Sequence, residues 1–294
     1  MYILLLGNQN SQTLLEIFAY LNKTKSEDIL WFSNKDIVNK LVVDDAIDPN
    51  GKTRLSWEID GYHLSTTNVL GIINNLDYLE DVLFEDFQEE DRKYAQSEYN
   101  AYLLFSLSQF KNILNPPWGG NLSGSCHSLP YQWLLVRQLN SNIKIPIHYF
   151  GFPNNVSAQL TSNLNTVISK NIFDTRHWLT DEVDLSNIDY PVLFYERPTG
   201  TPVLISVLDD IYWAKDLYSD AHVQINKDEW SLVLNLMNFF HLRMASILIF
   251  YSKDKITFGS IEPGIDINLL PQSQNESFLV NISKKVYDNA PKKS

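Results

Sequence analysis

The loop from Trp118 to His127 brings the most reactive side chains of the sequence together with a high density of glycine. Three glycines precede the Cys126-His127 pair at its end. A cysteine nucleophile needs a base aimed at its sulfur, and side chains of adjacent residues seldom point at one another. Long loops with special backbone requirements often carry binding functions. We therefore expect Trp118, Cys126 and His127 to contact a substrate, and we assign no catalytic residue.

Charged side chains near the ends of apolar runs form a second group of candidates. Lys170 and Glu196 each end a predicted strand, and Arg176 follows Lys170 in a polar stretch. Glu262 comes directly after another apolar run. The common interpretation of Lys170 and Glu262 is a lysine at the surface and a glutamate at a turn. Glu196 and Arg197 could hold a ligand by their backbone and side chains, and a local ion pair between them is equally typical.

Composition limits the classes of partner. The 294 residues carry a net charge of −12, which argues against general nucleic-acid binding because phosphate neutralisation needs clustered Lys and Arg. Cys126 is the only cysteine, which excludes an intrachain disulfide and a thiolate metal cluster. No apolar run approaches the roughly 18 residues of a membrane helix, and the first residues lack the basic start of a signal peptide. We expect a cytoplasmic protein with no nucleic-acid or membrane partner.

Hydrophobic patterning predicts that the chain opens β-α-β. Tyr2–Leu6 is a continuous apolar run typical of a strand buried on both faces, a helix follows over Thr13–Leu21, and Ile29–Phe32 reads as the next strand. Asp60-Gly61 indicates a hairpin turn. A long helix is expected over 89–110. Its spacing places six residues on one side: Tyr94, Ala95, Glu98, Ala101, Tyr102 and Phe105.

From about Asn155 onward the sequence becomes richer in strand patterns. The expected elements are strands at Val192–Glu196, Val203–Leu208, Ile211–Trp213, Ala245–Tyr251 and Thr257–Ile261, with a helix at Asp228–Phe240. These patterns predict an α/β (α+β) chain of two domains, 1–150 and 151–294, with the boundary near Gly151-Phe152-Pro153.

The order of these elements resembles that of the ATP-grasp carboxylate–amine ligases, particularly those that modify ribosomally made peptides. The long helix and the Asn115-Pro116 that follows it match their first half. Pro191–Glu196 resembles the strand that leads to their adenine hinge, and the runs 245–251 and 258–264 resemble the two strands that end in their metal-binding motif. The resemblance implies a Rossmann-like pre-grasp module, then an ATP-grasp-like antiparallel-sheet domain, with ATP and Mg²⁺ as cofactors.

Most charged residues of that family are absent from the matching positions. By the resemblance, Leu129 occupies the position of a nucleotide-contacting lysine. Thr201-Pro202-Val203 occupies the position of the arginine that neutralises the transferred phosphate. Leu248 stands for the first metal-ligating aspartate. In the final motif Ser260 replaces a glutamate, while Glu262 occupies the place of an asparagine.

The remaining matches are few. Lys170 matches a second lysine that reaches the phosphates, so the resemblance implies that Lys170 and Glu262 are a remnant phosphate and metal site. Arg176 lies in the stretch that would replace a phosphate-covering loop. No glycine occurs between Gly151 and Gly200, although such ligases fold a glycine-containing loop in this stretch. Phosphoryl transfer depends on Mg²⁺ and cationic side chains that neutralise spread negative charge. The replacements therefore predict that binding of ATP and Mg²⁺ is weak or lost.

These observations favour a degenerate ATP-grasp-like protein, a pseudoenzyme. It would bind a peptide or protein substrate, or partner a modifying enzyme, in peptide natural-product biosynthesis. One alternative is an active ATP-dependent carboxylate–amine ligase whose ligands lie elsewhere in the chain. Another is a nucleotide-sugar-dependent glycosyltransferase, for which Asp209-Asp210 is the only acidic motif after a strand, although the pair also reads as a turn. The apolar content is compatible with a homodimer.

Overall fold

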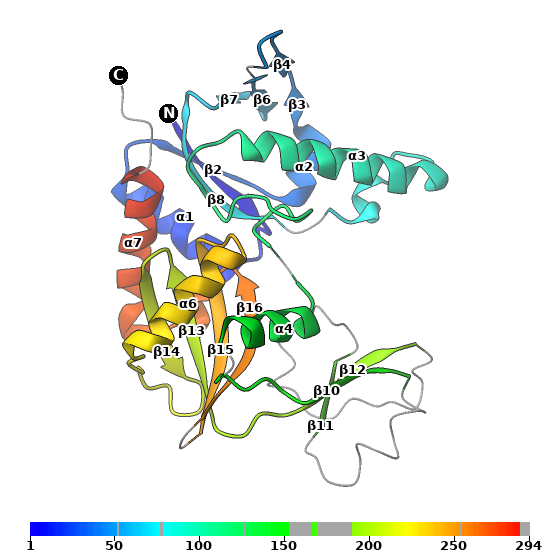
Figure 1. Ribbon diagram of the computed structural model, residues 1–294. Coiled ribbons are helices and arrows are strands. Elements are labelled where there is room, and N and C mark those ends of the chain that lie inside the picture. Colours follow the sequence, from blue (N-terminus) through cyan, green and yellow to red (C-terminus); the bar gives the residue numbers. More distant parts are fainter. Residues whose placement is uncertain are drawn as a thin grey trace. The chain divides into compact units, whose positions relative to one another are not determined.

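The computed structural model describes residues 1–51, 53–76, 79–125, 127–140, 142–152, 166–169, 190–252 and 255–288. Contacts divide the chain into two compact units, both of which appear in Figure 1. Unit 1 consists of Met1–Ser125, Phe239–Met244 and Pro263–Ser294, and unit 2 of Cys126–Asn238 and Ala245–Glu262. Each unit therefore combines segments that are distant in the sequence.

Unit 1 is built on a four-stranded sheet in the order β2-β1-β8-β9. Its strands are β1 (Tyr2–Gly7), β2 (Asp28–Phe32), β8 (Val69–Asn75) and β9 (Ile113–Leu114). All three pairings are parallel. The four central side chains of β1 are completely buried, as expected for a parallel strand covered on both faces. The predicted β-α-β start is confirmed by β1, α1 (Gln12–Thr24) and β2.

The helix α3 (Glu89–Ser108) supplies part of the core of unit 1. Leu4 and Ile72 of the sheet share a buried cluster with Leu103 and Leu107 of α3. The predicted helix is thus confirmed, but only part of the set of six residues expected on one side is covered. Ala95 and Tyr102 pack against the cluster, whereas Tyr94 is 69% exposed. Helical spacing shows which residues share a face, whereas the position of the neighbouring sheet decides which face is buried.

The helix α7 (Asn275–Asp288) also packs on unit 1, where it contacts α1 and β8. Asn112 Nδ2 donates hydrogen bonds to Val286 O and to Leu70 O, which links the helix to the sheet. A Cβ on Gly71 would lie 2.7 Å from Val286 O, so only glycine permits this approach. The last described segment of the chain is therefore part of the packing around its first strands.

Short strands extend unit 1 beyond its main sheet. One additional sheet has the order β3-β6-β7, and a separate ribbon pairs β4 with β5. The bounds are β3 (Val42–Val43), β4 (Ala46–Ile47), β5 (Thr53–Arg54), β6 (Ser56–Ile59) and β7 (Tyr62–Ser65). Asp60 and Gly61 both have positive φ, of 50° and 79°, which confirms the hairpin turn expected from this dipeptide.

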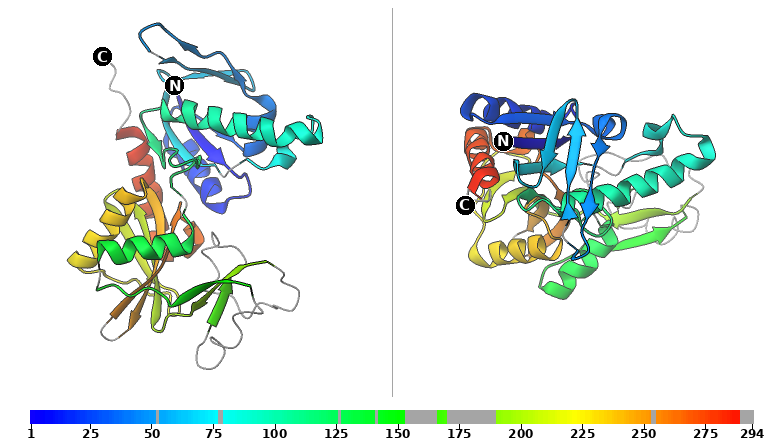
Figure 2. Two further views of the ribbon diagram at one scale, coloured as in Figure 1. Left: turned by 45° about the vertical axis from the view of Figure 1, so that its right-hand side comes forward. Right: turned by 90° about the horizontal axis from the view of Figure 1, so that it is seen from above.

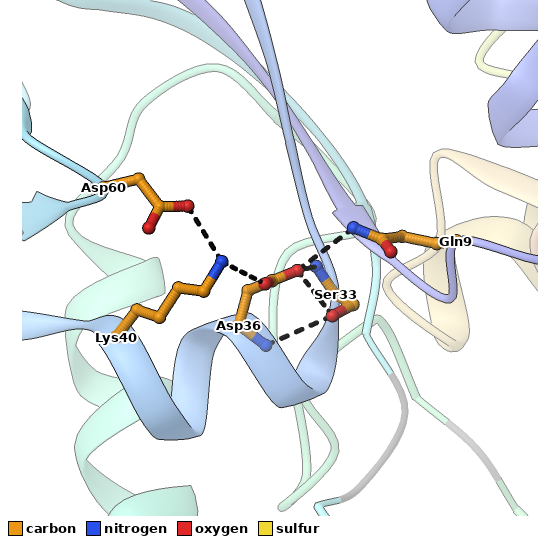
Figure 3. A network of polar contacts seen from close by, with 5 residues as sticks. All are labelled: Gln9, Ser33, Asp36, Lys40 and Asp60. Atoms are coloured by element: carbon orange, nitrogen blue, oxygen red, sulfur yellow. Dashed lines mark hydrogen bonds and ion pairs between the residues drawn. The ribbon is translucent and has the colours of Figure 1, made fainter.

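A polar network joins three parts of unit 1 at the start of α2 (Asn34–Lys40) (Figure 3). Ser33 and Asp36 form a reciprocal cap, in which Ser33 Oγ accepts from Asp36 N at 3.1 Å and Asp36 Oδ2 accepts from Ser33 N at 2.9 Å. Gln9, in the turn after β1, donates to the same Asp36 oxygen at 3.1 Å. Lys40 Nζ lies 2.8 Å from Asp36 and 3.0 Å from Asp60. The amide of Gln9 is thus bound within the protein.

Unit 2 contains two sheets. The larger has the order β14-β13-β15-β16, formed by β13 (Thr201–Leu208), β14 (Ile211–Asp216), β15 (Met244–Ser252) and β16 (Lys255–Pro263). The smaller has the order β10-β12-β11, with antiparallel pairs between β10 (His148–Gly151), β12 (Val192–Glu196) and β11 (Thr166–Ser169). Among the described residues of this unit, the helices are α4 (Leu129–Leu139) and α6 (Lys227–Phe239). None of the described helices has the length and apolarity required to span a bilayer.

The helix α4 belongs to unit 2 through hydrogen bonds to β16. Gln132 Nε2 donates to Ile261 O at 3.1 Å, and Gln132 Oε1 accepts from Ile261 N at 2.9 Å. Trp133 Nε1 donates to Gly259 O at 2.7 Å. Along the chain, the first boundary between unit 1 and unit 2 therefore lies between Ser125 and Cys126. The two-domain division at 150 and 151 stays a prediction.

Candidate functional site

The strands β15 and β16 are neighbours in unit 2 and carry the positions expected for metal ligands. Leu248 on β15 is 6% exposed. A Cβ on Gly259 of β16 would lie 3.0 Å from Leu248 O and 3.2 Å from Leu248 Cγ, so these two residues meet across the strand pair. Ser260, the next residue of β16, is 3% exposed. The strand pair thus offers a leucine side chain and a buried serine where two carboxylates are expected.

Glu262 is the carboxylate that remains on this strand pair, and it is partly buried near the end of β16. Mg²⁺ requires about six oxygen ligands, of which a protein site usually supplies one or two carboxylates. Within the described ranges, no group of three or more His, Cys, Asp or Glu side chains could hold a metal ion. The strand pair therefore supplies one carboxylate, Glu262, and an ion held there would take its other ligands from phosphate and water.

The strand β12 is buried along most of its length and ends at a partly exposed Glu196. Its antiparallel pairings to β10 and β11 hold the backbone in register on both sides. Glu196 N donates to Ile147 O at 2.8 Å, so this backbone donor is already used within the sheet. A ligand at Glu196 would therefore contact its side chain or its carbonyl group.

The positions expected to carry cationic side chains are apolar and buried. Leu129, the first residue of α4, is completely buried. Val203 at the start of β13 is 1% exposed, and Pro202 O accepts a hydrogen bond from Leu217 N at 2.9 Å. Neither leucine nor valine can neutralise a phosphate. These positions contribute to the packing of unit 2.

In unit 1, the loop after β9 is organised by two buried asparagines. Asn115 has a left-handed φ of 55° and is completely buried, as is Asn74 at the end of β8. Asn74 Nδ2 donates to Asn115 O at 2.9 Å and to Leu122 O at 2.6 Å. Asn115 Oδ1 accepts from Met244 N at 2.8 Å, and Asn115 Nδ2 donates to Met244 O at 2.7 Å. The loop is therefore tied to the sheet at one side and to Phe239–Met244 at the other.

Trp118 lies in this loop and stacks on His241, with ring centroids 3.6 Å apart and planes at 29°. The loop closes through hydrogen bonds between Trp118 N and Asn121 O and between Asn121 N and Trp118 O, both at 3.0 Å. One side of the indole is thus covered by the imidazole, while half of its surface is exposed. An ordered and partly exposed indole is well suited to contact a ligand.

No protein-family model matches the sequence, and no curated protein matches it. Solved structures, however, match over nearly the whole chain. A RiPP-associated ATP-grasp ligase of Chryseobacterium gregarium, in complex with ADP and a leader and core peptide, shares 14% identity, with 99% of this chain and 97% of that chain covered and a TM-score of 0.67. The macrocyclase MdnC of Microcystis aeruginosa, bound to its precursor peptide MdnA, shares 15% identity, with 96% and 100% covered and a TM-score of 0.68.

A third structure is the ATP-grasp ligase PsnB complexed with a minimal precursor, Mg and ADP. It shares 12% identity, with 97% of this chain and 98% of that chain covered and a TM-score of 0.67. The fold is that of the ATP-grasp ligases. The resemblance expected from the order of elements is confirmed, and so is the mixed α/β class with several sheets.

In the ATP-grasp fold of this chain, the predicted substrate residues are placed as follows. Trp118 belongs to unit 1 and His127 to unit 2, while Cys126 lies outside the described residues. His127 is partly buried, its ring lies 4.7 Å from that of Tyr131, and burial lowers the pKa of its imidazole. The neutral form of His127 is therefore favoured near pH 7. Assignment of the three residues to one substrate site stays a prediction.

The predicted phosphate ligands Lys170 and Arg176 lie outside the described residues, so their roles also stay predictions. Asp209 and Asp210 form the two-residue connection between β13 and β14, where Leu208 pairs with Ile211. Asp209 has a φ of 52°, which fits a tight hairpin turn. The turn interpretation of this pair is therefore confirmed.

Sequence patterns did not reveal the hydrogen-bonding roles of Asn74 and Asn115 or the stacking of His241 on Trp118. Two buried asparagines that bond the backbone of other segments give no periodic signal, because their partners lie far along the chain. A usable signal is the position of Asn74 and Asn115, since each directly follows an apolar run. His241 has a left-handed φ of 51°, a value that spacing does not reveal.

Proposed function

We propose that this chain is a catalytically degenerate ATP-grasp protein in peptide natural-product biosynthesis, which binds a peptide or protein substrate or partners a modifying enzyme. The observation that carries the proposal is the β15–β16 pair, where buried Leu248 and buried Ser260 occupy two positions expected to hold carboxylates. Carboxylates are needed at such a place to hold Mg²⁺ on the phosphates of ATP. In this chain the two positions carry the apolar side chain of Leu248 and the hydroxyl group of Ser260.

The rate that is lost with the charged side chains is large enough to support a catalytically degenerate protein. A cation that stabilises the transferring phosphoryl group contributes about 10³–10⁵ in rate. In this chain, buried Leu129 and Leu248 take two of the expected charged positions, and the uncharged segment Thr201-Pro202-Val203 takes a third. Neutral packing side chains stabilise unit 2, but they leave the charge of a bound triphosphate uncompensated.

A peptide partner is supported by the proteins that share the fold. The C. gregarium ligase was solved with a leader and core peptide, and MdnC with its precursor peptide. Peptide binding requires no metal ion, so it can persist where ATP chemistry has been lost. The partly exposed and stacked Trp118 is the residue of the described loop that we propose contacts the peptide.

A second candidate is an active ATP-dependent carboxylate–amine ligase. It is favoured by Glu262, a carboxylate kept on β16, and by the ADP and Mg found with PsnB. In that case Lys170 and Arg176 would supply the phosphate contacts. Replacement of Lys170 or Glu262 would then abolish ligation, whereas a degenerate protein would keep its peptide affinity.

Isothermal titration of the full chain with Mg-ATP decides between the two candidates. We expect no binding in the micromolar range, and no ADP release when precursor-type peptides are added. Micromolar affinity combined with peptide-dependent ADP release would contradict degeneracy and establish the ligase. The same peptides titrated without nucleotide test the binding function directly.

A further inference from the structure

The first half of α3 extends away from the sheet of unit 1 together with the short helix η1 (Asp81–Phe84), as Figures 1 and 2 show. Residues 89–99 include no buried side chain, and the buried positions of α3 begin at Asn100. One side of this half packs on unit 1, because Ala95 and Tyr99 lie against the buried core cluster and Tyr99 Oη donates to Ile37 O at 2.7 Å. The exposed side, which carries Tyr94, is a helical surface available to a partner.

Apolar side chains protrude from this region, which we call the η1–α3 surface and define as residues 80–98. Val82 is 59% exposed, Phe87 50% and Tyr94 69%. They are held by ordered backbone, because the Arg92 guanidinium donates to Phe87 O at 3.2 Å and to Glu85 O at 3.3 Å. The surface is thus formed before any partner arrives, which lowers the entropy cost of binding.

The η1–α3 surface is also strongly acidic. It contains eight carboxylates and two basic residues, which gives half of the net charge of the whole chain. One of the two basic side chains, Arg92, is engaged with backbone carbonyls. The surface therefore combines apolar anchors with a concentrated negative potential.

We propose that the η1–α3 surface docks a basic peptide segment, with Lys or Arg on the carboxylates and apolar side chains over Val82, Phe87 and Tyr94. Charge complementarity selects this occupant. A second copy of the chain would set eight carboxylates against eight, and nucleic acids or anionic lipids would be repelled in the same way. The inference rests on the proposed peptide-binding function and names the chemical class and position of the peptide.

The binding probe is a fluorescein-labelled helical peptide of about 18 residues, with Lys and Arg on one face and Leu and Phe on the other. Two further probes have Glu in place of the basic residues, or the same composition in scrambled order. Fluorescence anisotropy with the full chain should show binding of the basic amphipathic probe, at least tenfold weaker binding of the scrambled probe, and none of the acidic probe. Equal affinity for all three, or no binding of the basic probe, overturns the inference.

Matched variants locate the site. Glu89→Gln/Glu90→Gln and Tyr94→Ala should each weaken binding of the basic probe at least fivefold. The controls Asp228→Asn/Glu276→Gln remove first-turn carboxylates from α6 and α7, and Tyr218→Ala removes another tyrosine, 77% exposed. These controls should change the affinity less than twofold. Equal effects of test and control variants overturn the inference.

Hydrogen exchange of the unmodified chain with the basic probe gives an answer that does not depend on any variant. Protection should concentrate on residues 80–98. Protection elsewhere places the peptide on another surface and overturns the inference, while the peptide-binding part of the proposed function stands. The Mg-ATP titration tests the degenerate nucleotide site independently of both results.

Discussion

Asn115 binds both backbone hydrogen-bonding groups of Met244, since its Oδ1 accepts from Met244 N at 2.8 Å and its Nδ2 donates to Met244 O at 2.7 Å. Asn115 Oδ1 also accepts from Arg243 N at 3.0 Å. One buried side chain thus replaces a strand partner for residues that are more than a hundred positions away in the sequence.

We predict that Asn115→Ala lowers the free energy of unfolding by about 3–5 kcal/mol. The change leaves buried backbone groups of Arg243 and Met244 unpaired, at a cost of about 1–3 kcal/mol for each unsatisfied group. It also places a Cβ-bearing residue without a helpful side chain at a φ of 55°. Urea unfolding measures the difference. Asn22→Ala, an exposed helical asparagine, is the control and should stay within about 0.5 kcal/mol of the original chain.

Glycine is required at position 124 for space as well as for backbone conformation. A Cβ on Gly124 would overlap Leu242 Cδ2, and its φ is +70°. Gly119 has a φ of +59° but open space around its Cβ position. We therefore expect Gly124→Ala to cost about 2–4 kcal/mol and Gly119→Ala about 1 kcal/mol. Equal losses in thermal unfolding would show that the contact with Leu242 is not the cause.

Ile247→Asp should create affinity for divalent cations. Leu248 shares a face of the strand pair with Gly259, so Ile247 shares the other face with Ser260 and Glu262. Without metal, a buried and unpaired carboxylate costs about 3–5 kcal/mol of stability. Mg²⁺ bound between the new carboxylate and Glu262 should recover part of this loss by mass action. The measurement is the change in Tm on adding millimolar Mg²⁺. Leu248→Asp is the control, because this neighbouring residue is also buried but points away from the face of Glu262.

A pH-dependent contribution to stability is expected from Glu27 and Tyr287. Tyr287 Oη donates to Glu27 Oε2 at 2.7 Å, and this hydrogen bond lowers the pKa of the Glu27 carboxyl. A lowered pKa in the folded state means that the stabilisation is complete above the unfolded-state pKa of about 4.5 and is lost as the pH falls through the folded-state value. Burial and the same partner raise the pKa of Tyr287, so its hydroxyl stays protonated at neutral pH.

Tyr287→Phe removes this hydrogen bond while it keeps the ring under Lys25 Nζ, which lies 3.9 Å from the ring centroid. Because both groups are partly exposed, we expect a loss of no more than about 1 kcal/mol at pH 7. The loss should shrink as the pH is lowered from 5 to 3. A loss that is independent of pH over this range would assign the effect to packing instead.

Sequence patterns predicted the helices, strands and turns better than they predicted which segments pair or pack against one another. The run Tyr2–Leu6 has no alternation, and the strand is indeed buried on both faces. Asp60-Gly61 specified its turn through local backbone preference. The identity of Leu248 was visible, but its position opposite Gly259 was not, because pairing between β15 and β16 depends on the fold. In α3, spacing grouped Tyr94 with Ala95 and Tyr102 but could not show that Tyr94 is exposed while the other two pack against the core.

The division of the chain into two units was the feature hardest to predict from the sequence. Phe239–Met244 belongs to unit 1 because Asn115 and Trp118 bind it, and neither residue signals a distant partner through its neighbours in sequence. The roles of Lys170, Arg176 and Cys126 rest on sequence alone.

The closeness of Gly71 to Val286 has a consequence for biosynthesis. A ribosome releases residues 69–75 long before residues 275–288. The contacts of β8 with α7 therefore cannot form while most of the protein is still being translated. During that interval the apolar sheet surface that α7 later covers is open to chaperones or to aggregation. The unit that begins to fold first is therefore the last to be completed.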